Sequence, residues 1–121
     1  MTIHENSPSG PLTLVFGASG YIGTHLVPRL LAERRAIRAV ARHRAVLETR
    51  GWQDVEIVEA DALKPETLTK ALAGVSVAYY LVHSMAAGKD FGALDLVAAG
   101  HFADAAGHAG LRRIVYLGGL V

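Results

Sequence analysis

The stretch Leu12 to Gly23, LTLVFGASGYIG, decides the fold of this 121-residue chain. Its first five residues form a short apolar run that ends at a glycine, as a buried strand does. A helical pattern follows, in which Ile22, Leu26 and Leu30 recur every four residues. A strand, a glycine-rich turn and a helix in this order are the context in which such a turn binds a dinucleotide.

Each glycine of the turn has a predicted task. Gly17 permits the tight turn out of the strand, and Gly20 lacks a Cβ atom, so that a pyrophosphate can approach the backbone. Gly23 lets the helix pack closely on the sheet. The three glycines therefore predict a pyrophosphate site rather than a turn with a purely structural role.

The beginning of the helix supplies the remaining polar groups of this site. The free N–H groups near Tyr21 and Ile22 are expected to point at the phosphates, where the helix macrodipole also favours negative charge. Ser19 has two possible roles, either as the cap of the helix or as a contact to a phosphate.

Strand and helix patterns alternate outward from this stretch. Further strands are predicted at 36–41, 55–58, 75–82 and 114–117, and further helices at 45–50, 65–73 and 91–108. In the last helix the inward-facing residues are predicted to be Leu94, Val97, Phe102 and Ala105. Five strands with four intervening helices predict an α/β fold of the Rossmann type, a doubly wound parallel sheet in the order 3-2-1-4-5 within three α/β/α layers.

The domain organisation is predicted to be simple. Residues 1–11 are expected to form a flexible lead-in, and residues 12–121 one NAD(P)-binding domain. The fifth strand, followed by the apolar Leu120 and Val121, would leave an open sheet edge. We therefore expect either that the chain is truncated after this strand and continues in a longer protein, or that it self-associates through the edge.

Composition and charge exclude several classes of partner. The net charge of +1 gives no case for nucleic acid or membrane binding. The chain has no cysteine, so a disulfide framework and a thiolate zinc site are both impossible, and no metal site is predicted. No signal peptide or membrane span is evident, and a cytoplasmic location is expected. Seven of the 12 basic residues lie between positions 29 and 50: Arg29, Arg34, Arg35, Arg38, Arg42, Arg44 and Arg50.

Three segments carry a resemblance to a known family. The spacing Gly-x-x-Gly-x-x-Gly within Phe16–Gly23 resembles the atypical and extended branch of the short-chain dehydrogenase/reductase superfamily. The blocks 79–85, YYLVHSM, and 114–119, IVYLGG, make the chain similar to the NAD(P)H-binding, NmrA-like group. This resemblance implies the cofactor domain of an oxidoreductase that acts on a small organic substrate. The alternative is a non-catalytic NADP(H) redox sensor that regulates a partner.

The end of the second strand bears on the choice of dinucleotide. NAD-binding sites commonly place an acidic residue there to bind the ribose 2′-hydroxyl, but residues 40–44, VARHR, contain none. Arg42, with Arg44 in support, could instead grip a 2′-phosphate. This pattern predicts NADP(H) as the cofactor, with NAD(H) the less favoured one. The alternative is that Arg42 is a solvated loop residue.

Residues after the third and fourth strands complete the predicted site. The resemblance implies that Asp61 and Ala62 reach the adenine edge, although Asp61 could equally cap the following helix. Leu81, Val82 and His83 end the fourth strand beside the point where ligands bind in such sheets, and are expected to line the adenine-ribose side. His83 is expected to pack or to form hydrogen bonds rather than to act in catalysis.

No catalytic residue is predicted in this chain. Active reductases of the resembling family use a Ser or Thr after the fifth strand and a Tyr-x-x-x-Lys pair. Here the serine position is occupied by Gly118 and Gly119, and no tyrosine is followed four residues later by a lysine. Whether the protein is an enzyme therefore stays open at the level of the sequence.

Overall fold

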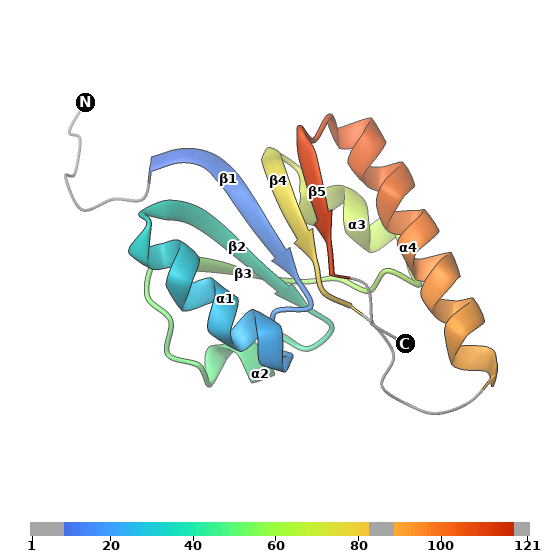
Figure 1. Cartoon of the computed structure of the whole chain (residues 1–121), viewed down its shortest axis with the longest axis horizontal. Helices are drawn as coiled ribbons and strands as arrows, with labels where there is room; N and C mark the ends of the chain where they lie inside the picture. The colour runs from blue at the N-terminus through green and yellow to red at the C-terminus, as the bar shows by residue number, and fades with distance from the viewer. Residues whose placement is uncertain (1–8, 83–88, 118–121) are drawn as a thin grey trace.

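A five-stranded parallel sheet forms the centre of the protein, as predicted (Figure 1). The computed structural model describes residues 9–82 and 89–117. The strands lie in the order β3-β2-β1-β4-β5, and every neighbouring pair is parallel. Their bounds are β1 Ser9–Phe16, β2 Arg35–Ala41, β3 Val55–Glu59, β4 Val75–Tyr80 and β5 Arg113–Tyr116.

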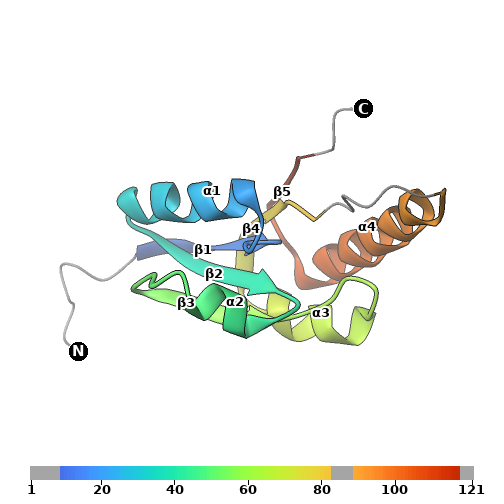
Figure 2. The same ribbon diagram turned by 90° about the horizontal axis from the view of Figure 1, so that it is seen from below.

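Four helices connect the strands and cover both faces of the sheet. They are α1 Tyr21–Ala32, α2 Arg44–Glu48, α3 Pro65–Leu72 and α4 Lys89–Ala109. Figure 2 shows α1 on one side of the sheet and α3 and α4 on the other, which confirms the three-layer prediction. None of the helices in the described part of the chain combines the length and the hydrophobicity that a membrane span needs.

Two hydrophobic clusters hold these layers together. Successive side chains of a strand point to opposite faces, so β1 supplies Leu14 to one cluster and Val15 to the other. The cluster of Val15 includes Val27 of α1 and Leu47 of α2. The cluster of Leu14 packs against α3 and α4, and its α4 residue Phe102 is fully buried.

The first strand begins three residues before its predicted start. The predicted lead-in of residues 1–11 therefore ends too late, because residues 9–11 belong to β1, while residues 1–8 lie outside the described part of the chain. Ser9 already pairs with Arg35, and the register shifts between Ser9 and Leu12. Pro11 lacks the N–H group that a regular ladder needs, and proline in a sheet is confined to edges and irregular positions. A strand with such an irregularity is not recognisable as an apolar run.

The predicted inward face of α4 is partly wrong. Leu94 and Val97 were expected to face the core, but their exposed fractions are 43% and 47%. The buried face instead follows a four-residue spacing and consists of Ala98, Phe102 and Ala106, with Ala105 half-buried against the same cluster. Small side chains on either side of one large ring allow α4 to approach the sheet closely, which larger side chains at these positions would prevent.

Arg38 fixes α3 to the sheet. Its Nε atom donates to Oε1 of Glu56 at 2.8 Å, and Nη1 donates to the backbone carbonyls of Ala71 at 2.6 Å and Ala73 at 2.8 Å. The guanidinium therefore satisfies carbonyl groups at the end of α3, which have no partner within the helix. One side chain thus connects β2, β3 and α3.

Candidate dinucleotide-binding site

A cavity of about 760 Å³ opens where the carboxyl ends of the strands meet. The register places Phe16 of β1 beside Val40 of β2 and Tyr80 of β4. The chain runs from β1 to β2 and β3 on one side, then crosses back to β4 on the other side of β1. This reversal of direction is the switch point at which ligands bind in open α/β sheets.

Most of the predicted site residues line this cavity. They are Gly17, Ser19, Gly20, Tyr21, Ile22, Gly23, Arg42, Asp61, Ala62, Leu81 and Val82. Arg44 is not among the lining residues. His83 and the pair Gly118 and Gly119 lie outside the described residues. The cavity therefore brings together segments that follow β1, β2, β3 and β4.

Gly17 turns the chain out of β1 in a conformation that favours glycine. Its φ angle is +90°, and a Cβ atom there would lie 3.1 Å from the side chain of Val82 and 3.2 Å from the backbone of Leu81. The N–H groups of Gly17 and Ala18 both donate to the carbonyl of Val40, at 2.9 and 3.1 Å. These two bonds hold the turn against the end of β2.

The other two glycines of the turn differ sharply in their surroundings. A Cβ atom at Gly23 would lie 2.6 Å from Cα of Ala18, so the packing of α1 on the turn requires glycine there. A Cβ atom at Gly20 would meet only the carbonyl oxygen of Gly17, at 3.7 Å, and the φ angle of −78° suits any residue. Nothing in the described chain requires glycine at position 20. A bare backbone beside the cavity fits the close approach of a pyrophosphate.

The N-terminus of α1 offers unsatisfied hydrogen-bond donors to this space. The N-cap residue is Gly20, and no side chain caps the helix, so the capping role considered for Ser19 is not observed. The N–H groups in the first turn, at Tyr21, Ile22 and Gly23, have no carbonyl partner within the helix. These donors and the positive end of the helix dipole suit an anion.

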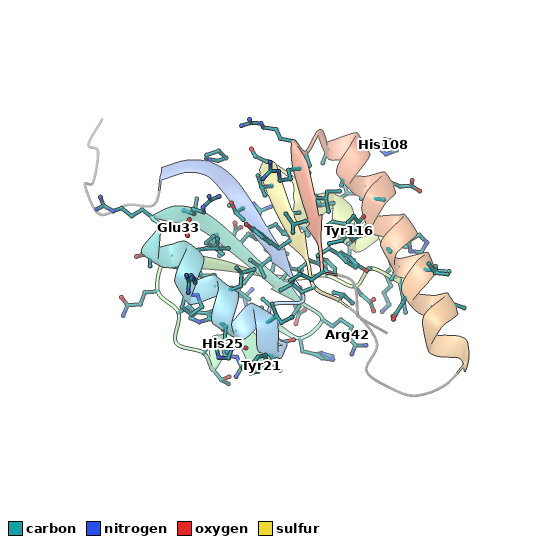
Figure 3. The ribbon with its side chains drawn as sticks, in the orientation of Figure 1. Tyr21, His25, Glu33, Arg42, His108 and Tyr116 are labelled. Atoms are coloured by element: carbon teal, nitrogen blue, oxygen red, sulfur yellow. The ribbon has the colours of Figure 1, made fainter. Side chains whose placement is uncertain are left out.

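The side chain of Tyr21 points away from the protein. It is 80% exposed, and its ring lies 4.4 Å from the ring of His25, measured between centroids, on the outer side of α1 (Figure 3). His25 Nδ1 also lies 2.8 Å from the backbone carbonyl oxygen of Tyr21. The contribution of Tyr21 to an anion site therefore comes from its backbone.

Arg42 and Arg44 have different surroundings although they are two residues apart. Arg42 directly follows β2, is exposed and lines the cavity (Figure 3). Arg44 begins α2, where its N–H donates to Oε2 of Glu59 at 2.9 Å and its Nε lies 3.6 Å from Oε1 of Glu48. The structure brings Arg42 to the cavity but leaves Arg44 among acidic side chains beside it.

The loop after β3 is held in place from two directions. Asp61 Oδ1 accepts the N–H of Leu63 at 2.9 Å, and the N–H of Asp61 donates to Oγ1 of Thr67 at 2.9 Å. His101 Nδ1 lies 2.7 Å from the carbonyl oxygen of Ala62, which ties the loop to α4. Asp61 thus stabilises the turn with one carboxylate oxygen, and the residue also lines the cavity.

One wall of the cavity could not be predicted from the sequence. The lining residues that it did not assign are Phe16, Ala41, Ala60, Leu63, Leu94, Asp95 and Ala98. The last three belong to α4, which reaches the loop after β3 only because both pack on the same face of the sheet. No local pattern in the sequence reports this contact.

Two observations describe the chemistry near the cavity. The described residues contain no group of three or more His, Cys, Asp or Glu side chains that could hold a metal ion. Tyr80 lies next to Phe16, and burial, assisted by the nearby Tyr116 and Asp95, raises the pKa of its phenol to about 12. Burial therefore favours the neutral phenol over the phenolate.

Comparison with known proteins gives the same assignment. A family model described as NAD(P)H-binding matches residues 17–120. Triphenylmethane reductase from Citrobacter sp., solved in complex with NADP(H), is 32% identical over 88% of this chain and 37% of its own, with a TM-score of 0.75. A short-chain dehydrogenase/reductase superfamily protein from Agrobacterium tumefaciens, solved with bound NAD, is 25% identical over 87% of this chain and 31% of its own, with a TM-score of 0.73.

The solved structures are longer than this chain. This chain spans about a third to a half of the length of the solved structures that it matches. A search of curated protein sequences gave no match. The family model, in contrast, covers nearly the whole chain. The resemblance to short-chain dehydrogenase/reductase-type proteins is thereby confirmed, and the chain belongs to the family of NAD(P)H-binding domains.

Proposed function

We propose that the cavity binds NADP(H) in preference to NAD(H), as the cofactor site of a reductase. The observation that carries this proposal is the position of Arg42. It lines the cavity at the end of β2, and within residues 9–82 and 89–117 it forms no ion pair and no side-chain hydrogen bond. A guanidinium group in this state is available to an incoming phosphate.

The acidic residue nearest in register does not oppose this choice. Glu59 pairs with Ala41 across β3 and β2, which brings a carboxylate close to the end of β2. That carboxylate accepts the backbone N–H of Arg44, and Glu59 is not among the cavity-lining residues. Glu59 therefore takes no part in the wall of the cavity, where an acidic residue would bind the ribose 2′-hydroxyl.

Each part of the cavity has a task in this proposal. The first turn of α1 and the bare backbone at Gly20 hold the pyrophosphate, and Arg42 contacts the 2′-phosphate. Asp61 and Ala62 face the adenine. Bound NADPH supplies the hydride for reduction, and the residues of this chain bind and orient it.

The solved relatives include proteins with both cofactors. The Citrobacter reductase was solved with NADP(H) and the Agrobacterium protein with NAD, so membership of the superfamily does not select one of them. The proposed preference therefore depends on Arg42. The proposed activity of the whole protein is reduction of a substrate by NADPH.

Calorimetric titration with NADPH and with NADH tests the proposal. A hydrogen bond to a charged group contributes about 1.5–3 kcal/mol, which predicts a roughly 10- to 150-fold preference for NADPH. Arg42→Ala should remove most of this preference and leave the NADH affinity within about twofold. The matched control is Arg29→Ala, which removes an exposed arginine in the last turn of α1, outside the cavity.

Two results would contradict the proposal. One is equal affinity of the wild-type protein for the two cofactors. The other is an Arg42→Ala variant that loses affinity for both cofactors alike, since that would make Arg42 a general contributor rather than a contact to the 2′-phosphate.

A further inference from the structure

We propose that His101 of α4 is a positioning residue for the adenosine half of the cofactor. It holds the β3–α3 loop, residues 60–64, against α4 without itself lining the cavity. The role rests on the proposed function only in taking the cavity as a dinucleotide site. It does not depend on the choice between NADP(H) and NAD(H).

The imidazole of His101 reaches a distant segment of the chain. Its Nδ1 atom lies 2.7 Å from the carbonyl oxygen of Ala62, 39 positions earlier, and the side chain is half-buried. A carbonyl oxygen only accepts hydrogen bonds, so Nδ1 carries a proton and is the donor. His25 and His108 also place Nδ1 2.8 Å from a carbonyl oxygen, but that oxygen belongs to their own helix, four residues earlier. The bond of His101 therefore joins two elements, whereas the other two bonds are local.

The β3–α3 loop has hydrogen bonds of its own. The N–H groups of Leu63 and Lys64 donate to Oδ1 and to the carbonyl oxygen of Asp61, at 2.9 and 2.8 Å. The N–H of Asp61 donates to Oγ1 of Thr67 at 2.9 Å. These bonds lie within residues 61–67, so they fix the shape of the loop but not its distance from α4.

The bond of His101 spans one side of the cavity. Asp61, Ala62 and Leu63 line the cavity from the loop, and Leu94, Asp95 and Ala98 line it from α4. Ala98 precedes His101 by three residues, so the two side chains are neighbours on the surface of the helix. The separation of these two walls is therefore set where His101 meets Ala62.

Hydrogen bonding and apolar packing contribute differently to this contact. Ala62 and Ala98 are both buried in the same hydrophobic cluster, which draws the loop toward α4. Apolar contacts of this kind are non-directional. The hydrogen bond is directional, and it therefore fixes the orientation of the Ala62 carbonyl and of the peptide that joins it to Leu63.

This arrangement should affect only ligands that reach the loop. Without the bond, the loop has more freedom before binding, and a ligand that contacts it must order it at a cost in affinity. A pyrophosphate at the first turn of α1 does not contact the loop and avoids this cost. NADPH and NADH both carry adenosine, so the ratio of their affinities should stay as it is in the wild-type protein.

Three variants test the role. His101→Leu removes the donor, whereas the amide nitrogen of His101→Asn takes approximately the position of Nδ1 and can donate to Ala62. The matched control is His108→Leu, near the end of the same helix (Figure 3), which removes an imidazole bonded only to the carbonyl of Asp104. If His101→Leu does not fold, His101→Gln replaces it, since its amide nitrogen lies one bond further from the backbone.

The ligands are NADPH, NADH, ADP and inorganic pyrophosphate, the last two titrated by competition. ADP and pyrophosphate share two linked phosphates, and only ADP carries adenosine. We expect His101→Leu to weaken NADPH, NADH and ADP alike, about threefold to tenfold, as for the loss of one neutral hydrogen bond, and to change pyrophosphate less than about twofold. His101→Asn should restore the affinities, and His108→Leu should leave all four unchanged.

Amide hydrogen exchange tests the loop in the ligand-free protein. The N–H of Leu63 is protected by its bond to Asp61, and local opening of the loop exposes it. Its exchange should be faster in His101→Leu than in the wild-type protein, and it should return to the wild-type rate in His101→Asn.

The outcomes separate this role from the proposed function. Wild-type affinity for NADH and ADP in His101→Leu, or equal weakening of ADP and pyrophosphate, would overturn the role of His101. Failure of His101→Asn to restore binding would overturn it as well. A wild-type protein that binds NADPH and NADH equally would refute the preference for NADP(H) and leave the role of His101 intact. A wild-type protein that binds no dinucleotide would refute the proposed function itself.

Discussion

Replacement of the glycines at positions 20 and 23 by alanine should separate binding from folding. Gly20→Ala places its Cβ atom 3.7 Å from the nearest protein atom, at a backbone conformation that alanine adopts freely. The only cost to the fold is that alanine is a poorer N-cap than glycine, which amounts to under about 1 kcal/mol. The free energy of unfolding should therefore change little.

Binding should respond strongly to the same Gly20→Ala change. The added methyl group occupies the space through which a pyrophosphate reaches the first N–H groups of α1. Loss of two hydrogen bonds to charged oxygens, at roughly 1.5–3 kcal/mol each, predicts an affinity at least about 100-fold lower. NADPH and NADH should be weakened alike, because both carry the pyrophosphate.

Gly23→Ala should instead lower the stability of the fold. Its Cβ atom would lie 2.6 Å from Cα of Ala18, which is backbone and cannot rotate away. Overpacking of this kind costs about 1–3 kcal/mol, and each kcal/mol lowers the melting temperature of a domain near this size by roughly 4–8 °C. Thermal unfolding followed by circular dichroism measures the loss.

A third glycine variant controls for the substitution itself. Gly100→Ala lies in the exposed face of α4 with no atom within 4 Å of its Cβ, so it should raise stability by about 0.5–1 kcal/mol and leave titrations unchanged. Wild-type affinity in a folded Gly20→Ala variant would refute the assignment of the pyrophosphate site. Equal stability of the two variants at positions 20 and 23 would refute the packing argument.

Three further predictions concern stability. Arg38→Met should lower the free energy of unfolding in urea by about 2–4 kcal/mol, because two carbonyls at the end of α3 lose their donor. The control Glu56→Gln should lower it by under about 1 kcal/mol. Similar losses for the two variants would contradict this prediction. Phe102→Ala should cost about 3–5 kcal/mol, since the ring is fully buried, and a loss below 1 kcal/mol would place the core elsewhere. Because the pKa of Tyr80 is raised to about 12, the phenol of the folded protein keeps its proton at pH values where that of the unfolded protein ionises. The free energy of unfolding should therefore fall between pH 10 and pH 12 by about 1.4 kcal/mol per pH unit, and Tyr80→Phe should remove this part of the loss. An unchanged slope in the variant would refute this prediction.

The parts of the structure that could be predicted from the sequence are those that a single segment of the chain determines. The run from Leu12 to Phe16 and the glycines after it specify a strand, a turn and a helix without reference to any other segment. Strand order follows because right-handed crossovers and the switch of direction after the third strand leave few alternatives. The cavity residues after β1, β2, β3 and β4 could be named for the same reason, since the ends of parallel strands lie at one edge.

The parts that were missed depend on contacts between distant segments. Leu94 and Val97 have the spacing of a buried stripe, but which stripe of α4 is buried is decided by the large ring of Phe102 against the sheet. Arg38 and Arg50 could not be told from solvated arginines, because their partners lie at least 18 positions away for Arg38 and 31 for Arg50. The beginning of β1 was missed because Pro11 interrupts the pattern by which strands are recognised.

The segment from Arg42 to Arg50 has a consequence for the evolution and redesign of such domains. It is nine residues long, it carries Arg42, which lines the cavity, together with Arg44 and Arg50, and Leu47 is its one buried side chain. Mutations elsewhere in the segment therefore escape the packing constraints that govern the sheet. A lineage could exchange one dinucleotide for the other by drift within this short surface module, provided that a leucine-sized anchor remained. An engineer could transplant the module between related domains for the same purpose, with the scaffold beneath it left intact.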